Sequence, residues 1–209
     1  MRAVHLVRKI LTIIALVGLF SFGQTALSHA ETQASFVVRS FYAQLTNAMK
    51  QGDQLGFSGR YRKLDPAVRA AFNLPLMAKV SVGSSWVNAS PQEQKELVEA
   101  FSDFSVASYA SQFVRDDGVK FSVTDEKPGE DGSVVVESVL QPQTGDPVAL
   151  NYLMRLDNQG KFRIVDVYLN GTISELATRR AEFSSIARRD GIEALVNSLG
   201  QKSKELGPS

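Results

Sequence analysis

The sequence of 209 residues contains no cysteine, and its two histidines, His5 and His29, both lie within the first thirty residues. Without cysteine the chain forms no disulfide and offers no thiol nucleophile or thiolate metal ligand. Beyond residue 30 there is no imidazole either, which excludes histidine-dependent nucleophiles and the usual zinc, haem and iron–sulfur sites. Carboxylate chemistry is the main catalytic route left. We therefore expect no metal and no cofactor.

The chain also lacks an excess of charge of one sign. It has 23 Lys and Arg against 22 Asp and Glu, a formal net charge of +1. Arg2, Arg8 and Lys9 are the charged residues of the first thirty, so the remainder of the chain has a net charge of −2. Nucleic-acid binding needs clustered Lys and Arg, and we expect no nucleic-acid partner.

The first thirty residues have the layout of a secretory signal peptide. The three basic residues precede an apolar run at 10–22, and the small residues Ser28 and Ala30 stand where a signal peptidase reads. The run is shorter than the roughly 20 residues that span a bilayer, which favours cleavage after Ala30 over a permanent anchor. We expect a signal peptide at 1–30, one domain at 31–209, and a periplasmic location.

The first half of the domain shows the spacing of helices. Ser90-Pro91-Gln92-Glu93 combines a serine cap, proline at the first helical position and glutamate at the third, which is a capping box. Apolar residues recurring every three or four positions mark the other helices, and glycine or proline marks their ends. The predicted order is a helix at 34–51, a glycine-rich break at 52–59, a short helix from Asp65-Pro66, a helix from Asn73 to Gly83, and a long helix from Ser90 to about Phe113.

The apolar period then changes to two, which indicates strands. Short, turn-rich connections between them are typical of an antiparallel meander. The predicted strands are Val119–Thr124, Val134–Gln141, Val148–Leu156 and Lys161–Leu169, followed by helices on either side of Asp190-Gly191. Helices segregated from an antiparallel sheet predict an α+β domain.

Two long strings of residues carry a resemblance to a known family. The first runs from Pro75-Leu76-Met77-Ala78 through Val82-Gly83 to Trp86 and the capped helix; the second is 164–171, followed by Ile173-Ser174, Arg180 and Phe183. In this order the chain resembles the MlaC-type family of periplasmic lipid-binding proteins, which includes toluene-tolerance auxiliary proteins. The Asn-Leu-Pro-Leu-Met and Gly-Thr-Ile-Ser-Glu-Leu strings are most similar to its hopanoid-associated HpnM branch. At residues 171–174 this chain has Gly-Thr-Ile-Ser, whereas the family commonly has Gly-Val-Ser.

The resemblance implies a non-catalytic lipid shuttle. Its members have a helical layer on a curved antiparallel sheet of about four strands, with an apolar cavity between them for acyl chains. The implied cargo is phospholipid or a hopanoid-like lipid. The implied partners are an inner-membrane ABC transporter complex that contains an MCE-domain protein, and an outer-membrane partner.

Apolar residues on the strand faces and the aromatic residues of the helices are candidates for the cavity wall, although each is equally suited to an ordinary core. Met154 suits a variable lipid because methionine is adaptable. The candidate lipid-binding residues are Trp86, Phe101, Phe104, Tyr109, Val134, Val136, Leu150, Tyr152, Met154 and Ile164.

Asp166 interrupts an otherwise apolar strand, and a buried carboxylate needs a partner. Arg180 is the predicted partner, in a structural ion pair that joins the following helix to the sheet. The alternative is a general base in an enzyme of steroid-isomerase shape, with Tyr152 or Tyr168 as its ionisable partner. A further alternative is an accessory protein with a filled core that binds a transporter. A cavity of several hundred Å³, the size of ligand sites, would distinguish the carrier from it.

Overall fold

The computed structural model describes residues 32–207, and the predicted signal peptide lies outside them. Helices precede and follow a sheet, as predicted for an α+β domain. Among the described residues no helix is both long and apolar enough to cross a membrane. The elements are α1 (Gln33–Lys50), α2 (Gly52–Ala71), α3 (Leu74–Val82), α4 (Ser85–Asn88), α5 (Pro91–Gln112), β1 (Lys120–Pro128), the 3₁₀ turn η1 (Glu130–Gly132), β2 (Val134–Gln141), β3 (Val148–Leu156), β4 (Phe162–Leu169), β5 (Ile173–Ser174), α6 (Glu175–Asp190) and α7 (Ile192–Glu205).

The predicted helix starts at α1, α3 and α5 are confirmed because local capping determines them. The side-chain oxygen of Asn73 accepts the amide of Leu76, and Pro75 stands in the first turn of α3. The capping box of α5 is complete: the Ser90 hydroxyl accepts the amide of Glu93, and the Glu93 carboxylate accepts the amide of Ser90. Helix α5 continues to Gln112, with Phe113 as its C-cap.

The predictions for α2 are partly wrong. The glycine-rich break at 52–59 is confined to Gly56, whose φ of 58° and ψ of −174° kink an otherwise continuous helix. The predicted helix start at Asp65-Pro66 is wrong, because Pro66 lies inside α2. A proline there removes one backbone hydrogen bond, whereas the helix buries an apolar stripe that includes Leu64 and Val68 across the same segment. Tertiary burial therefore overrides the local stop signal.

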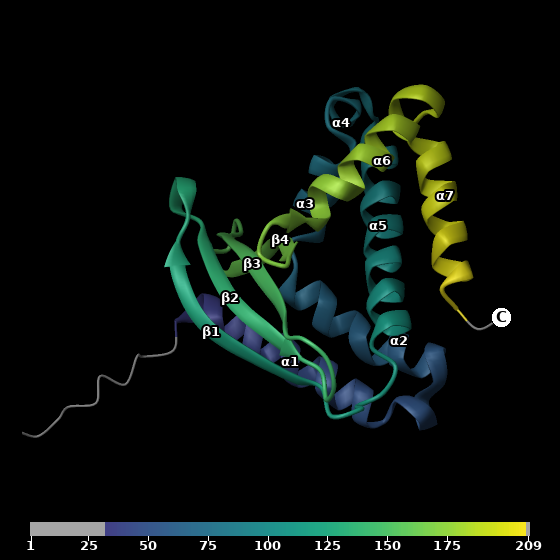
Figure 1. Ribbon diagram of the computed structural model, residues 1–209. Helices are drawn as coiled ribbons and strands as arrows, with labels where there is room; N and C mark the ends of the chain where they lie inside the picture. The colour runs from purple at the N-terminus through teal and green to yellow at the C-terminus, as the bar shows by residue number, and fades with distance from the viewer. Residues whose placement is uncertain (1–31, 208–209) are drawn as a thin grey trace, which may run out of the picture. The chain divides into compact units, whose positions relative to one another are not determined.

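The sheet is an antiparallel meander in which, within the described residues, five strands follow the order β1-β2-β3-β4-β5. β2 and β3 have the predicted bounds, β1 is longer, and the two-residue β5 was not predicted. The register shifts in the β1–β2 pair, where β1 has one extra residue between Val123 and Asp125, and in the β3–β4 pair, where β4 has one extra residue between Ile164 and Asp166. Such bulges bend strands and increase their twist, and Figure 1 shows the strands curving along α1.

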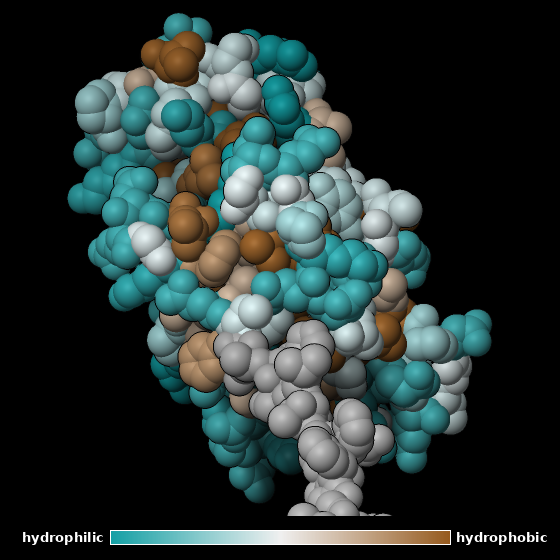
Figure 2. All heavy atoms as spheres, turned by 90° about the vertical axis from the view of Figure 1, so that its left-hand side faces the viewer, coloured by the Kyte–Doolittle hydropathy of each residue, from teal (hydrophilic) through white to brown (hydrophobic). Residues whose placement is uncertain are grey.

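The helices pack as a layer against one side of this sheet. α1 contacts β1, β2 and β4; α5 packs between α2 and α7; and α6 joins β4 to α3 and α7. Figure 1 shows α5 and α7 side by side on the far side of the molecule from β1 and β2. On the sheet side, apolar side chains are visible at the surface between polar ones (Figure 2). The buried apolar residues come from the helices and from β2, β3 and β4, so the main core lies between the sheet and the helices.

Candidate functional site

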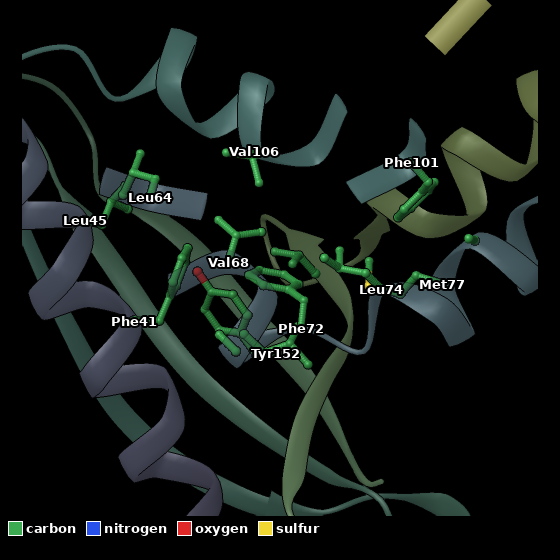
Figure 3. Close-up of a cluster of buried hydrophobic side chains, with 14 of the residues drawn as sticks. Phe41, Leu45, Leu64, Val68, Phe72, Leu74, Met77, Phe101, Val106 and Tyr152 are labelled. Carbon is green, nitrogen blue, oxygen red and sulfur yellow. The ribbon is translucent and has the colours of Figure 1, made fainter. Parts of the chain in front are cut away.

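An apolar cavity of about 180 Å³ lies between the sheet and the helices. Its wall is built by α1, α2, α3, α5 and α6 together with β1, β3 and β4, so the cavity belongs to the tertiary fold and not to one motif. Figure 3 shows several of its wall residues, Val68, Phe72, Leu74 and Tyr152, gathered between the strands and α5. The wall consists of Leu45, Val68, Phe72, Leu74, Met77, Ser105, Ser108, Tyr109, Gln112, Phe113, Phe121, Leu150, Tyr152, Val167, Leu169, Glu175, Leu176 and Arg179.

Contacting aromatic rings form one side of this wall. The rings of Phe41 and Tyr109 meet edge to face at 5.1 Å between centroids, and Tyr109 stacks on Phe113 at 5.8 Å. Phe113 in turn contacts Phe121 of β1 at 5.9 Å, which continues the aromatic surface from α5 to the sheet. Pairs of this kind add about 0.5–1.5 kcal/mol each beyond area burial. This side of the cavity is therefore well defined in shape.

The phenols near the cavity are uncharged. Burial raises the pKa of Tyr109 and of Tyr152 above the ordinary value for tyrosine. Burial likewise raises the pKa of Tyr42, whose hydroxyl is 2.5 Å from the hydroxyl oxygen of Ser138. Tyr42 also stacks against Phe121, at 4.6 Å between ring centroids. These groups offer apolar surface and neutral hydrogen-bonding atoms at physiological pH.

Charge is concentrated where α6 borders the cavity. Glu175 and Arg179 line the wall, one helical turn apart on α6. The serines of α5 contribute little polarity, since the hydroxyls of Ser105 and Ser108 donate to the carbonyl oxygens of Phe101 and Phe104 in their own helix. The cavity wall is thus mostly apolar, and its two charged side chains both come from α6.

The volume is smaller than the expected several hundred Å³. Ligand sites usually enclose about 300–1,000 Å³, and this cavity has about 180 Å³. The surfaces are not fully interdigitated, but the space is too small for a whole phospholipid. Accommodating one requires the helices to move away from the sheet.

Three of the ten predicted wall residues, Tyr109, Leu150 and Tyr152, do line the cavity. The other seven do not, because they pack in the core or at its margin. Phe101 and Phe104 contact the ring of Phe183 at 6.3 Å and 6.1 Å. The remaining five are Val136, Met154 and Ile164, which are fully buried in the core, Val134, which pairs with Met154 across the sheet, and Trp86, which is partly buried in α4.

The predicted ion pair between Asp166 and Arg180 is wrong. Asp166 is buried, but within residues 32–207 its carboxylate has no ion pair: it accepts hydrogen bonds from the amide of Val167 at 2.7 Å, the amide of Leu176 at 3.0 Å and the hydroxyl of Ser174 at 2.5 Å. The hydroxyl oxygen of Ser174 also accepts the amide of Ala177 and so caps α6. Asp166 therefore does join the following helix to the sheet, but through helix-terminal donors.

Arg180 lies elsewhere. It is exposed, and its guanidinium approaches Gly83, where an added Cβ would lie 3.6 Å from Nη2 of the arginine. Its predicted role fails because the amides of Val167 and Leu176 and the hydroxyl of Ser174 already satisfy the Asp166 carboxylate.

Replacing Asp166 by Ala is expected to lower the free energy of unfolding by about 2 kcal/mol. The buried amide of Val167 and the partly buried amide of Leu176 and hydroxyl of Ser174 would lose their acceptor. The melting temperature should fall by about 4–8 °C, measured by circular dichroism. Arg180→Ala is the control and should leave the melting temperature within about 1 °C. If the two variants lose equal stability, Asp166 and Arg180 do form the predicted ion pair.

Most wall residues were not singled out from the sequence. Phe72, Phe113 and Phe121 come from a helix C-cap, a second C-cap and a strand. The apolar period marks them as inward-facing, but nothing in it distinguishes a side chain beside a void from one in a filled core. Arg179 has a clearer signal, because it stands beside the predicted stripe of α6 between Leu176 and Phe183. Among the described residues, no group of three acidic or histidine side chains is placed to hold a metal ion.

Two comparisons with known proteins match this fold. The family model described as MlaC protein matches residues 39–201. Among solved structures, a phospholipid-binding protein from Ralstonia solanacearum, determined in complex with a phospholipid, superposes with a TM-score of 0.70 at 21% sequence identity. The match covers 84% of the present chain and 99% of the Ralstonia chain. At this identity the superposition establishes a common fold.

Proposed function

The chain belongs to the MlaC protein family, and from this premise we propose that it is a non-catalytic lipid carrier of the periplasm. Its cargo is phospholipid or a hopanoid-like lipid, whose acyl chain enters the space between the sheet and the helices. The single observation that carries the proposal is the apolar cavity in the core, in a fold shared with a protein solved in complex with a phospholipid.

The energetics of a lipid tail support a container of this kind. Exposing an acyl chain of sixteen carbons to water costs on the order of 12 kcal/mol, at about 0.8 kcal/mol for each methylene. A lipid crossing an aqueous compartment therefore needs an apolar lining. Here Leu150, Val167 and Leu169 of the sheet face Leu74 and other apolar residues of the helices across the cavity.

The carrier acts between two membranes in this proposal. The segment 1–30 directs export and is removed after Ala30, which leaves the domain 31–209 in the periplasm. The carrier exchanges lipid with an inner-membrane ABC transporter complex containing an MCE-domain protein and with an outer-membrane partner. Loading requires the cavity to enlarge, since its volume of about 180 Å³ is below that of a phospholipid site.

The structure argues against the specific enzyme considered above. A steroid-isomerase arrangement would need Asp166 and a tyrosine to converge in the cavity. Tyr152 lines the cavity, but Asp166 does not, and three hydrogen bonds occupy its carboxylate. The accessory-protein alternative predicts a filled core. The cavity of about 180 Å³ leaves the core partly open but is below the several hundred Å³ that would exclude this alternative, so extraction of lipid from the purified protein decides between the two.

Protein purified from its host and extracted with organic solvent should release about one lipid per chain, identified by mass spectrometry. The intact mass of the same preparation should correspond to a chain that begins at Glu31. A folded protein that yields no lipid, and that takes up none from vesicles of host lipid, would contradict the carrier function. The mass of the extracted lipid distinguishes the two cargoes, since a phospholipid contains phosphorus and acyl chains whereas a hopanoid contains a fused-ring hydrocarbon skeleton.

A further inference from the structure

Arg179 holds a cationic group that the fold leaves without a hydrogen-bond partner. Its Nη1 is buried. Of the buried side-chain nitrogen and oxygen atoms in the described residues, it is the one that has no hydrogen-bond partner. The buried Arg60, by contrast, is satisfied: it donates from Nε to the carbonyl oxygen of Ala110 at 2.8 Å and from Nη1 to that of Gly52 at 3.1 Å. A buried, unsatisfied charged donor is costly. Its presence calls for a functional explanation.

The guanidinium is held in place by aromatic rings instead of by an acid. Its Cζ lies 5.0 Å from the ring centroid of Phe104 and 5.8 Å from that of Phe101. Stacking of this kind orients the planar group and leaves its N–H edge free to donate. Burial lowers the pKa of Arg179, but an arginine remains protonated at physiological pH. The result is a fixed cation on the cavity wall.

The acidic groups near Arg179 do not neutralise it by contact. Glu175 shares the cavity wall, and Glu182 also acts on Arg179 through its charge. Within the part of the chain that the structure describes, neither forms an ion pair with Arg179 within 4.0 Å, and Glu182 pairs with Lys202 at 2.9 Å instead. Arg179 thus places a buried hydrogen-bond donor on the wall of the cavity. The nearby carboxylate of Glu175 repels anions, so it disfavours a doubly charged ligand more than a singly charged one.

We propose that Arg179 binds the singly charged phosphodiester of the lipid headgroup, with its buried Nη1 donating to a phosphate oxygen where α6 borders the cavity. The inference rests on the proposed lipid-carrier function and names the chemical group that the carrier recognises. Arginine suits this task because its planar donors match phosphate oxygens. Amphiphiles with phosphate are therefore preferred over neutral ones with the same tail.

The test compares two ligands that share a twelve-carbon acyl chain, lauroyl-lysophosphatidylcholine and monolauroylglycerol. Both are titrated below their micellar concentrations into delipidated protein by isothermal calorimetry. The unmodified protein should bind the phosphodiester at least about tenfold more tightly, the effect of one hydrogen bond between charged groups. Arg179→Met should remove this preference, so that the ratio of the two affinities falls from about ten or more to about one.

Arg180→Met is the matched control, because Arg180 is the adjacent but exposed arginine. It should retain the full preference, and Arg179→Lys should retain part of it. The Arg179→Met variant should melt at the same temperature as the unmodified protein or higher, since methionine fills the site without an unsatisfied donor.

The possible failures are distinguishable. If neither ligand binds the unmodified protein, the carrier function itself fails. If the unmodified protein binds both ligands equally, or if Arg179→Met keeps the tenfold preference, the protein carries lipid but Arg179 does not bind the phosphate group. If Arg179→Met lowers the melting temperature while the preference persists, its role is structural stacking on Phe101 and Phe104.

Discussion

A phenylalanine in place of Ser108 is expected to abolish lipid binding while the protein stays folded. Ser108 lies on the α5 wall of the cavity, opposite the sheet. A phenyl ring there would occupy much of the cavity volume of about 180 Å³. Excluding about four methylenes of an acyl chain costs about 3 kcal/mol, which is more than a hundredfold in affinity. Binding of a fluorescent phospholipid to delipidated protein measures the loss.

Ser108→Ala is the control at the same position. Its hydroxyl donates to the carbonyl oxygen of Phe104 in its own helix, so alanine removes a local bond without filling the cavity. Lipid affinity should stay within about twofold. Because overpacking can destabilise a core by about 1–3 kcal/mol, circular dichroism must show that the phenylalanine variant is folded at the assay temperature. Leu176→Trp, which fills the cavity from α6, provides a second blocked variant. If both variants fold and bind lipid as tightly as the unmodified protein, the lipid binds outside this cavity.

Alanine in place of Gly52 is expected to cause the largest loss of stability from a single added methyl group. A Cβ at this position would lie 1.6 Å from the carbonyl oxygen of Val114, so the backbone after α5 would have to move. The same junction holds Arg60, which donates to the carbonyl oxygens of Gly52 and Ala110. We expect a loss of about 3 kcal/mol or more in the free energy of unfolding. The melting temperature should then fall by about 6–12 °C or more.

Gly200→Ala is the same chemical change in an open position and should act in the opposite direction. Gly200 lies inside α7, and nothing is within 4 Å of an added Cβ. Alanine has the higher helix propensity, and the gain should be about 0.5–1 kcal/mol. The melting temperatures of Gly52→Ala, Gly200→Ala and the unmodified protein are compared by thermal denaturation. A Gly52→Ala variant as stable as the unmodified protein would show that α2 and the segment after α5 are not in the close contact described here.

Local sequence signals predicted the parts of the fold that depend on near neighbours. The caps at Asn73 and Ser90 work through residues three positions away, so each can be read without knowledge of the tertiary structure. The bounds of β2 and β3 follow from the apolar period and the turns beside them. The same local rules failed at Pro66, where burial of one face of α2 outweighs the hydrogen bond that proline removes.

The candidate site was less predictable. The sequence predicts that the Asp166 carboxylate needs a partner, but it does not show that the amide of Leu176 and the hydroxyl of Ser174 at the start of α6 supply the hydrogen bonds. Periodicity also placed Met154, Ile164 and Phe101 on inward faces correctly, and all three are fully buried. They nevertheless do not border the cavity, because inward direction is a property of the strand or helix, whereas a void depends on how several elements fit together.

By itself, the sequence determined the succession of helices, antiparallel strands and helices, the α+β class, the loss of histidine and thiol chemistry beyond residue 30, and the resemblance to a lipid-binding family. These depend on residue type, on spacing along the chain and on capping over a few positions. Only the tertiary structure decided which buried side chains face a cavity, how large that cavity is, and that Arg179 remains without a partner inside it. The physical reason is that packing and hydrogen-bond satisfaction depend on atoms far apart in sequence, whose meeting no local pattern encodes.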